Sequence, residues 1–316
     1  MDIIVLISSL IFSIISCFTY KKVWSITLSS EKIPSGYGFV LIFFILTFTH
    51  FLNLPLINIK VFIAILIFSS IYWIDDIKNL SFKFRLFLQF FCGTLIAFII
   101  LKENTFVFNN NFIIILICSG ILNIFLTNIV NFYDGLDLNI SVFTIIFSLV
   151  LIFLMTLEKD NYYLGLVILG FILGFGLFNF KPNIIFFGDS GCFVISCFIN
   201  FIIVKNVFLL EYNTAYLLIP LMLPTIDVLY VVLLRIYLNE SLLTRNYHHI
   251  YHKLNTKYKS KIYLLPQVIN ALGIFTISIF IIPNNNSTFL KFIFASTLLT
   301  IIFYFFVKFL IKKKDE

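Results

Sequence analysis

Five aspartates stand in three short polar segments of a chain that is otherwise 61% hydrophobic. The segments are YWIDDIK, which holds Asp75 and Asp76, NIVNFYDGLDLN, which holds Asp134 and Asp137, and FFGDSG, which holds Asp189. Charged groups near hydrocarbon are costly, so such placements usually line a water-filled cavity. Carboxylates there could hold a divalent cation or take a proton from a phosphate oxygen. For the first segment alone, an ordinary polar turn remains an equal alternative.

The second segment adds amides at a regular spacing. Asn128, Asn131, Asp134 and Asp137 recur every three residues. Such steps keep neighbours on one face of an α-helix, and they align all four residues in a 3₁₀ segment. A helix cap would explain one of these residues but not four. Because amides and carboxylates hydrogen-bond the edges of a nucleobase or sugar, the spacing favours a binding surface for such a group.

The third segment places Asp189 between Gly188 and Gly191, which allow a tight approach of the backbone. The residues that follow would begin a helix, and a helix start suits phosphate. Asp189 could simply cap that helix. We favour its use as a magnesium ligand, because Mg²⁺ is commonly held by one or two carboxylates and substrate phosphates. The ring of Phe186 could stack on a base.

Cations accompany the acids. Lys83 and Arg85 follow the paired aspartates, and RNYHHIYHKL supplies Arg245, His249 and His252. The histidines lack the HExxH pattern and the matching thiolates of a zinc site. Imidazoles beside a phosphate are one interpretation, and a solvated basic loop is the other.

The elements that must position these residues are membrane spans. Only 12% of the residues are charged, whereas a soluble surface of this size needs about 25%. Long apolar runs indicate an all-α, polytopic integral membrane protein rather than a barrel. Taking about 20 residues for each crossing, we expect eleven spans. They are placed at 2–19, 37–54, 58–74, 85–101, 112–130, 139–157, 161–179, 190–206, 214–237, 262–282 and 288–308.

Basic residues predict the orientation. With the N-terminus outside and the C-terminus inside, 17 of the 22 Lys and Arg residues fall on the cytoplasmic side. The first span is then an uncleaved anchor, and all five aspartates face the cytoplasm at the plasma (inner) membrane. The net charge of +7 mostly reflects this topology, so a nucleic-acid partner is not expected. We expect residues 1–316 to form one membrane-embedded domain.

The four polar segments, in this order, resemble the polyprenyl-phosphate N-acetylhexosamine-1-phosphate transferases, glycosyltransferase family 4, which include phospho-MurNAc-pentapeptide translocase. That family shows a double aspartate, N-x-x-N-x-x-D-G-x-D, F-x-G-D-x-G and a late histidine loop. IPSGYG at 33–38 also looks like the family's segment before the second span. The corresponding positions are Asp75-Asp76, Asn128 to Asp137, Phe186 to Gly191, and His249 to His252.

Two positions depart from the family pattern. The family often continues D-G-x-D-G-L, whereas Leu138 and Asn139 follow Asp137 in this chain. The family's H-x-H-H has Tyr251 in place of its middle histidine. Similar relatives with H-x-Y-Q handle deoxy amino sugars, so the identity of the sugar stays open.

The resemblance implies a reaction in which undecaprenyl phosphate attacks a UDP-amino sugar and releases UMP. It implies Mg²⁺, with Mn²⁺ as the alternative, held by Asp189 with Asp75 or Asp76. Asp75 or Asp76 would act on the lipid phosphate, and the Asn128–Asp137 segment would face the nucleotide sugar. His249 and His252, with Lys83, Arg85 or Arg245, would stabilise phosphate charge. The product would start a cell-surface polysaccharide. If the protein forms an oligomer, we expect a homodimer.

A transporter of nucleotide sugars or another anionic solute is the alternative. Transporters usually place polar groups near the midplane, in repeated broken helices, whereas these acids gather at one face and no repeat is evident. Asp227, which lies inside the ninth expected span after Pro224, is a further functional candidate.

Overall fold

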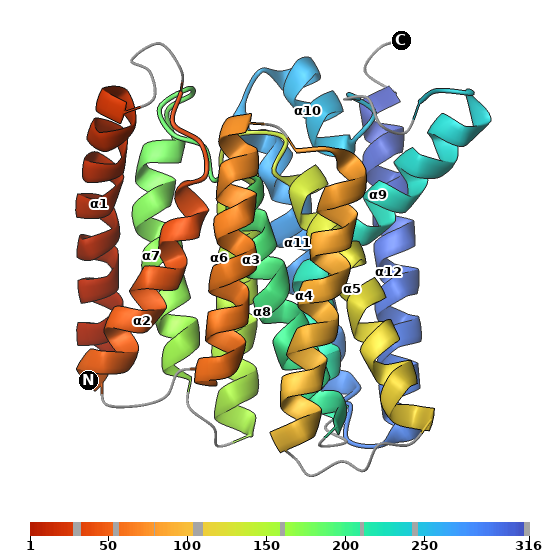
Figure 1. The fold of residues 1–316 in the computed structure, drawn as a ribbon. Coiled ribbons are helices and arrows are strands. Elements are labelled where there is room, and N and C mark those ends of the chain that lie inside the picture. Colours follow the sequence, from red (N-terminus) through yellow and green to blue (C-terminus); the bar gives the residue numbers. More distant parts are fainter. Residues whose placement is uncertain are drawn as a thin grey trace. The chain divides into compact units, whose positions relative to one another are not determined.

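The computed structural model describes residues 1–27, 33–52, 57–78, 80–103, 110–158, 162–208, 212–241 and 246–312. These residues form helices and turns without a strand (Figure 1). Contacts group the chain into two compact units, Met1–Leu210 and Glu211–Glu316. Each unit is described by itself, and the expectation of one domain stays a prediction.

Unit 1 holds eight α-helices and one 3₁₀ turn among its described residues. They are α1 (Asp2–Thr27), η1 (Tyr37–Phe39), α2 (Val40–Leu52), α3 (Ile59–Lys78), α4 (Phe82–Glu103), α5 (Asn110–Tyr133), α6 (Asn139–Leu157), α7 (Tyr163–Asn179) and α8 (Gly188–Phe208).

Unit 2 holds the remaining elements of the described chain. They are η2 (Tyr212–Leu217), α9 (Leu218–Tyr237), α10 (Ile250–Tyr258), η3 (Lys261–Leu264), α11 (Leu265–Phe280) and α12 (Asn286–Lys312).

The expected spans and the observed helices coincide. Each of the eleven ranges overlaps one α-helix of the described residues, and the range 139–157 matches α6 residue for residue. Among the described residues, eight helices are long and apolar enough to cross a membrane, and α2 and α7 are shorter apolar helices. α3 is not among the eight, because its charged end, with Asp75 and Asp76, leaves too short an apolar stretch. The polytopic helical class is confirmed at this level, while the count of eleven crossings and the orientation stay predictions.

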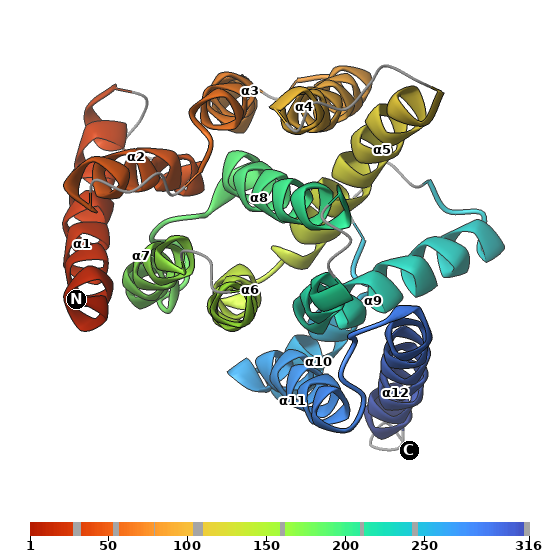
Figure 2. The same cartoon turned by 90° about the horizontal axis from the view of Figure 1, so that it is seen from below.

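Helix α8 is the core of unit 1. It packs against α3, α4 and α5, and Figure 2 shows it enclosed within that unit. Its burial follows from composition, because Ser196 and Asn200 are the polar residues in the nearly continuous run of buried apolar side chains from Cys192 to Ile202. Those two residues find partners inside the bundle: Ser196 donates to the Cys192 carbonyl, and Asn200 to Ser119.

Small residues bring α1 and α7 together. Ser9 and Ser13 of α1 donate to the backbone carbonyls of Val167 and Phe171, at 2.8 and 2.7 Å. A methyl group on Gly174 would approach the Ser13 side chain to 2.5 Å, so a larger residue would separate the helices. Together, α1 and α7 hold the segment before α2 in the interior of unit 1.

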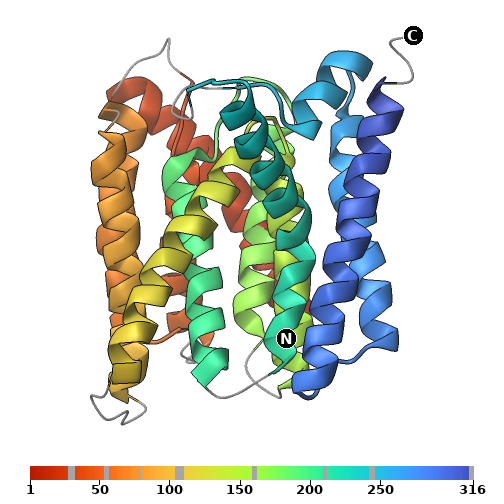
Figure 3. The same cartoon turned by 90° about the vertical axis from the view of Figure 1, so that its right-hand side faces the viewer.

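In unit 2, α9 and α12 pack together, α11 packs against both, and the short α10 contacts α12. Figure 3, where α12 is the darkest blue helix, shows α11 and α12 running side by side. Pro224 lies inside α9 and has no N–H, so the carbonyl of Pro220 loses its helical donor. The side chain of Gln267 replaces it with a hydrogen bond of 2.8 Å.

Candidate active site

The segment FFGDSG pairs with IPSGYG through the backbone. Phe186 donates its N–H to the Pro34 carbonyl at 2.8 Å, and Gly38 donates to the Phe187 carbonyl at 2.9 Å. Gly36 and Gly188 both have positive φ, 82° and 84°, which side chains rarely adopt. A Cβ on Gly188 would lie 2.3 Å from the Gly36 nitrogen, so glycine is required for this approach.

Tyr37 anchors the paired segments in unit 1. Its fully buried ring stacks on Phe171 and Phe175 of α7, with centroids 5.2 and 5.4 Å away. Its hydroxyl lies 3.2 Å from that of Ser13 and 2.6 Å from that of Ser16. The start of α8 is therefore held by α1, α7 and the segment before α2.

Asp76 binds the first turn of α8. Its Oδ1 accepts the N–H of Asp189 at 2.8 Å, and its Oδ2 accepts the N–H of Ser190 at 3.1 Å. These are N–H groups that a helix start leaves without internal partners, and the helix dipole favours a negative charge there. Asp189 does not cap its own helix, and its carboxylate points to another partner.

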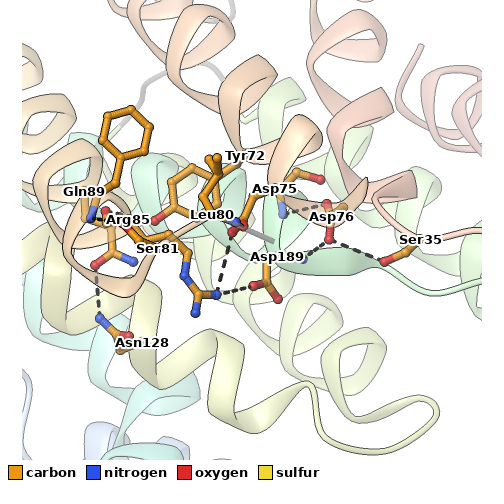
Figure 4. Close-up of polar contacts among 12 residues, drawn as sticks. Ser35, Tyr72, Asp75, Asp76, Leu80, Ser81, Arg85, Gln89, Asn128 and Asp189 are labelled. Atoms are coloured by element: carbon orange, nitrogen blue, oxygen red, sulfur yellow. Dashed lines mark hydrogen bonds and ion pairs between the residues drawn. The ribbon is translucent and has the colours of Figure 1, made fainter. Parts of the chain in front are cut away.

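Arg85 is that partner. Its Nη1 lies 2.9 Å from Oδ2 of Asp189 and 3.7 Å from Oδ2 of Asp75, so one guanidinium stands between two carboxylates from different helices (Figure 4). Asp75 is buried, and its Oδ1 accepts the N–H of Leu80 in the turn between α3 and α4. Arg85 and Asp189 are about one third exposed, so this ion pair is partly screened by solvent.

Asp134 lies close to the same cluster. It follows the last residue of α5, and its Oδ2 is 3.7 Å from the sulfur of Cys192, one turn into α8. Asp75, Asp134 and Asp189 therefore lie at one end of unit 1, as the sequence predicted. The negative charges of Asp76, Asp137 and Asp189 act on Asp134.

Like charges and burial disfavour ionisation in this cluster. Burial, followed by the charge of Asp189, raises the pKa of Asp76 to about 7. Burial also raises the pKa of Asp75, although the Leu80 N–H and Arg85 oppose it. The pKa of Asp134 lies well above its usual range, first through burial and then through Asp189. A bound cation would relieve this repulsion.

The donor set fits a magnesium ion that is completed by substrate. Within the described ranges, no three His, Cys, Asp or Glu side chains are grouped closely enough to hold a metal by themselves. The buried Oδ2 of Asp75 has no hydrogen-bond partner. A hard carboxylate oxygen near Asp189 is the ligand type that Mg²⁺ takes, together with phosphate oxygens.

Of the remaining predicted residues of unit 1, Asn128 is joined to the helix that carries Arg85. Asn128, in the last turns of α5, donates at 3.1 Å to Oε1 of Gln89, one turn beyond Arg85 on α4. The helix ends at Tyr133, so Asp134 and Asp137 stand on a turn and not on a common helical face with Asn128. Three of the other residues are partly exposed: Asn131, Asp137 and Phe186. Lys83 is exposed at the start of α4.

The histidine loop belongs to unit 2. His249 and His252 are buried, and Nδ1 of His249 lies 2.8 Å from Oδ2 of Asp227. The ring of Tyr251 stacks on His249 with centroids 5.2 Å apart. Arg245 lies outside the described residues.

Several contributors were missed by sequence reasoning. Gln89 could have been found as a polar residue four positions after Arg85 on the same helical face. Asn179, whose Oδ1 accepts the N–H of Leu138, ends an apolar helix without a distinguishing pattern. Tyr304, which binds Asp227, is one of 15 tyrosines and carries no sequence signal.

Comparison with known proteins agrees with this geometry. Residues 58–207 match the model of glycosyl transferase family 4. The resemblance read from the motifs is confirmed for this region. The matched family 4 region contains the paired aspartates, the Asn128–Asp137 segment and FFGDSG, and it leaves the histidine loop outside.

A "Putative glycosyltransferase" of Methanocaldococcus jannaschii is similar to this chain. The two are 30% identical over 206 residues, which is 61% of this chain and 64% of the relative. The chain thus covers slightly less than two thirds of that protein's length.

Proposed function

We propose that this protein transfers a sugar-1-phosphate from a UDP-amino sugar to a polyprenyl phosphate, such as undecaprenyl phosphate, and releases UMP. One observation carries the proposal: Asp75, Asp76, Asp134 and Asp189, from three distant segments, gather at one end of unit 1, where Arg85 stands between Asp75 and Asp189. The family 4 match over these segments supports it.

Phosphoryl transfer depends mainly on positioning and on neutralising charge. Asp189, with Asp75 or Asp76, would hold Mg²⁺, which would neutralise the diphosphate of the nucleotide sugar. Asp75, whose Oδ2 has no hydrogen-bond partner, suits the role of receiving a proton or ordering the lipid phosphate. Arg85 supplies positive charge beside both carboxylates. Asn128, Asn131, Asp134 and Asp137 would contact the nucleotide sugar, and Phe186 its base.

The remaining assignments extend this proposal. His249 and His252, with Lys83 or Arg245, would stabilise phosphate charge. The acids would face the cytoplasm at the plasma membrane, where the nucleotide sugar is found, and the lipid would arrive from the bilayer. The product would start a cell-surface polymer.

A reconstituted assay tests the proposal. Purified protein is mixed with undecaprenyl phosphate, Mg²⁺ and a panel of UDP-amino sugars, and UMP and lipid-linked sugar are measured. We expect both products in equal amounts with at least one sugar, and their loss in EDTA. Asp189→Asn should lower turnover by about 10³-fold with the protein still inserted. The variant would hold Mg²⁺ poorly, so the charge that develops on the phosphate would no longer be neutralised. Uptake of labelled nucleotide sugar into vesicles without lipid-linked product would favour the transporter instead.

A further inference from the structure

Unit 2 contains a buried carboxylate with three hydrogen-bond donors around it. Asp227, in the middle of α9, is 2% exposed. Its Oδ2 lies 2.8 Å from Nδ1 of His249. Its Oδ1 accepts the N–H of Ile250 and the hydroxyl of Tyr304, each at 3.1 Å. These donors come from the histidine loop, the first residue of α10, and α12.

The arrangement specifies where the protons are. A backbone N–H can only donate, and the hydroxyl of Tyr304 donates to the same oxygen. Hydrogen bonds to the charged form of a carboxylate favour that form. An ionised Asp227 can only accept, so the hydrogen bond to His249 requires a proton on Nδ1. In the neutral imidazole, Nε2 is then the basic nitrogen.

A purely structural role does not explain the charge. An aspartate buried in an apolar span is costly, whereas a neutral amide would join the same helices at lower cost. The Tyr251 ring, stacked on His249 with an interplanar angle of 12°, limits rotation of the imidazole from a second side. Two contacts therefore fix both the proton and the plane of this ring.

We propose that Asp227 is the positioning residue of His249: it holds the Nδ1–H tautomer and keeps Nε2 as the nitrogen that would stabilise phosphate charge, with Tyr304 fixing the carboxylate. The inference rests on the proposed function, because the phosphate belongs to that reaction. Asp227 itself does not touch substrate. The same logic holds a histidine between a carboxylate and a reacting group in hydrolytic triads.

Histidine-selective ¹⁵N NMR tests the tautomer without any activity. The chain has four histidines, so a His249→Gln variant assigns the signal of His249. A pH series isolates the neutral ring. We expect Nδ1–H in the wild type. In Asp227→Asn, the amide can donate to Nδ1, so the proton should move to Nε2. An Nε2–H wild type, or an Asn variant with the same tautomer as the wild type, would overturn the proposal.

The UMP-release assay tests the consequence. Asp227→Asn should lower kcat by about 10²–10⁴-fold while KM changes little, because a wrong tautomer impairs the reaction and not substrate binding. Tyr304→Phe should lower kcat by only a few-fold, roughly in proportion to one lost hydrogen bond. Thr300→Val, one turn earlier on α12 and bonded to the Ser296 carbonyl, is the matched control and should keep the wild-type kcat.

The two proposals fail in different ways. A wild type that forms no lipid-linked sugar with any donor refutes the proposed function, while the NMR still decides the tautomer. An active wild type whose kcat is unchanged by Asp227→Asn refutes only the role of Asp227.

Discussion

Asp76 accepts the backbone N–H of Asp189, so one aspartate of the cluster holds the helix turn that presents another. The two carboxylates therefore bind different kinds of partner. Asp76 bridges α3 and α8 through two backbone groups, whereas Asp189 meets the side chain of Arg85. A mutation of each should separate positioning from chemistry.

Asp76→Asn should reduce both stability and turnover. The new amide would present its NH₂ to backbone donors, and leaving such groups unpaired costs about 1–3 kcal/mol. Asp189→Asn should reduce turnover alone. Thermal unfolding in detergent and UMP release measure the two effects. An Asp76→Asn protein that is as stable and active as the wild type would contradict the assignment.

Arg85 should compete with the metal for Asp189. Removing its charge in Arg85→Gln leaves the carboxylates without a cation, so half of the variant's own maximal rate should be reached at a lower Mg²⁺ concentration. The maximal rate should fall by about 10- to 100-fold, because a group that stabilises phosphate charge is lost. A Mg²⁺ titration of UMP release gives both values.

Lys78→Gln is the control for Arg85. Lys78 is exposed at the end of α3, and its replacement removes the same charge without touching Asp75 or Asp189. An equal shift of the Mg²⁺ dependence in both variants would show that general charge, and not the position of Arg85, sets it.

Leu138 occupies a conformation that suits glycine. Its φ is 66°, a left-handed value that costs a side-chain-bearing residue about 1–2 kcal/mol. The family's usual glycine at this position is explained by that geometry. Leu138→Gly should therefore be more stable than Leu138→Ala by about 1 kcal/mol. The pair is compared by thermal unfolding, and a more stable alanine variant would show that the backbone is not strained.

Gly188→Ala should disrupt the pairing of FFGDSG with Pro34–Gly38. The added methyl group would meet the Gly36 backbone at 2.3 Å and would occupy a positive φ. We expect a loss of about 3 kcal/mol or more, as for other overpacked and strained sites. Gly176→Ala is the control, because its nearest neighbour would be 3.8 Å away and alanine favours helix. Limited proteolysis and unfolding midpoints compare the two.

Gln267 should matter only while Pro224 is present. Gln267→Leu leaves the Pro220 carbonyl unpaired within the bundle, at a cost of about 1–3 kcal/mol. Pro224→Ala restores a helical N–H to that carbonyl, so the same Gln267→Leu change should then cost much less. A double-mutant cycle measures this coupling, and additive effects would refute it.

The helices could be predicted because the length of each apolar run can be counted directly along the sequence. α6 was placed without error, since Asn139 and Glu158 bound its apolar residues. The gathering of Asp75, Asp134 and Asp189 could also be predicted. Each follows or precedes an expected span, and the alternating direction of the spans brings these ends to the same side. Their individual partners could not be predicted. Asp76 and Asp189 have different roles because Asp76 binds backbone N–H groups, and such backbone contacts carry no sequence signal.

The turn after α5 shows a second limit. The regular spacing of Asn128, Asn131, Asp134 and Asp137 favoured one shared face, but α5 ends at Tyr133 between the amides and the acids. Spacing describes a face only while the helix continues. Asp227 was singled out because an acid in an apolar span is rare, yet its partner Tyr304, far along the chain, was identified only from the structure.

The backbone pairing of Pro34–Gly38 with Phe186–Phe187 also has a consequence for biogenesis. During synthesis the first segment leaves the ribosome long before its partner exists, so its N–H groups lack these partners while the six helices from α2 to α7 insert. The start of α8 can then settle only once it meets a segment that is already in the membrane. Truncated nascent chains that end before Phe186 should therefore lack a formed site, however completely their helices have inserted.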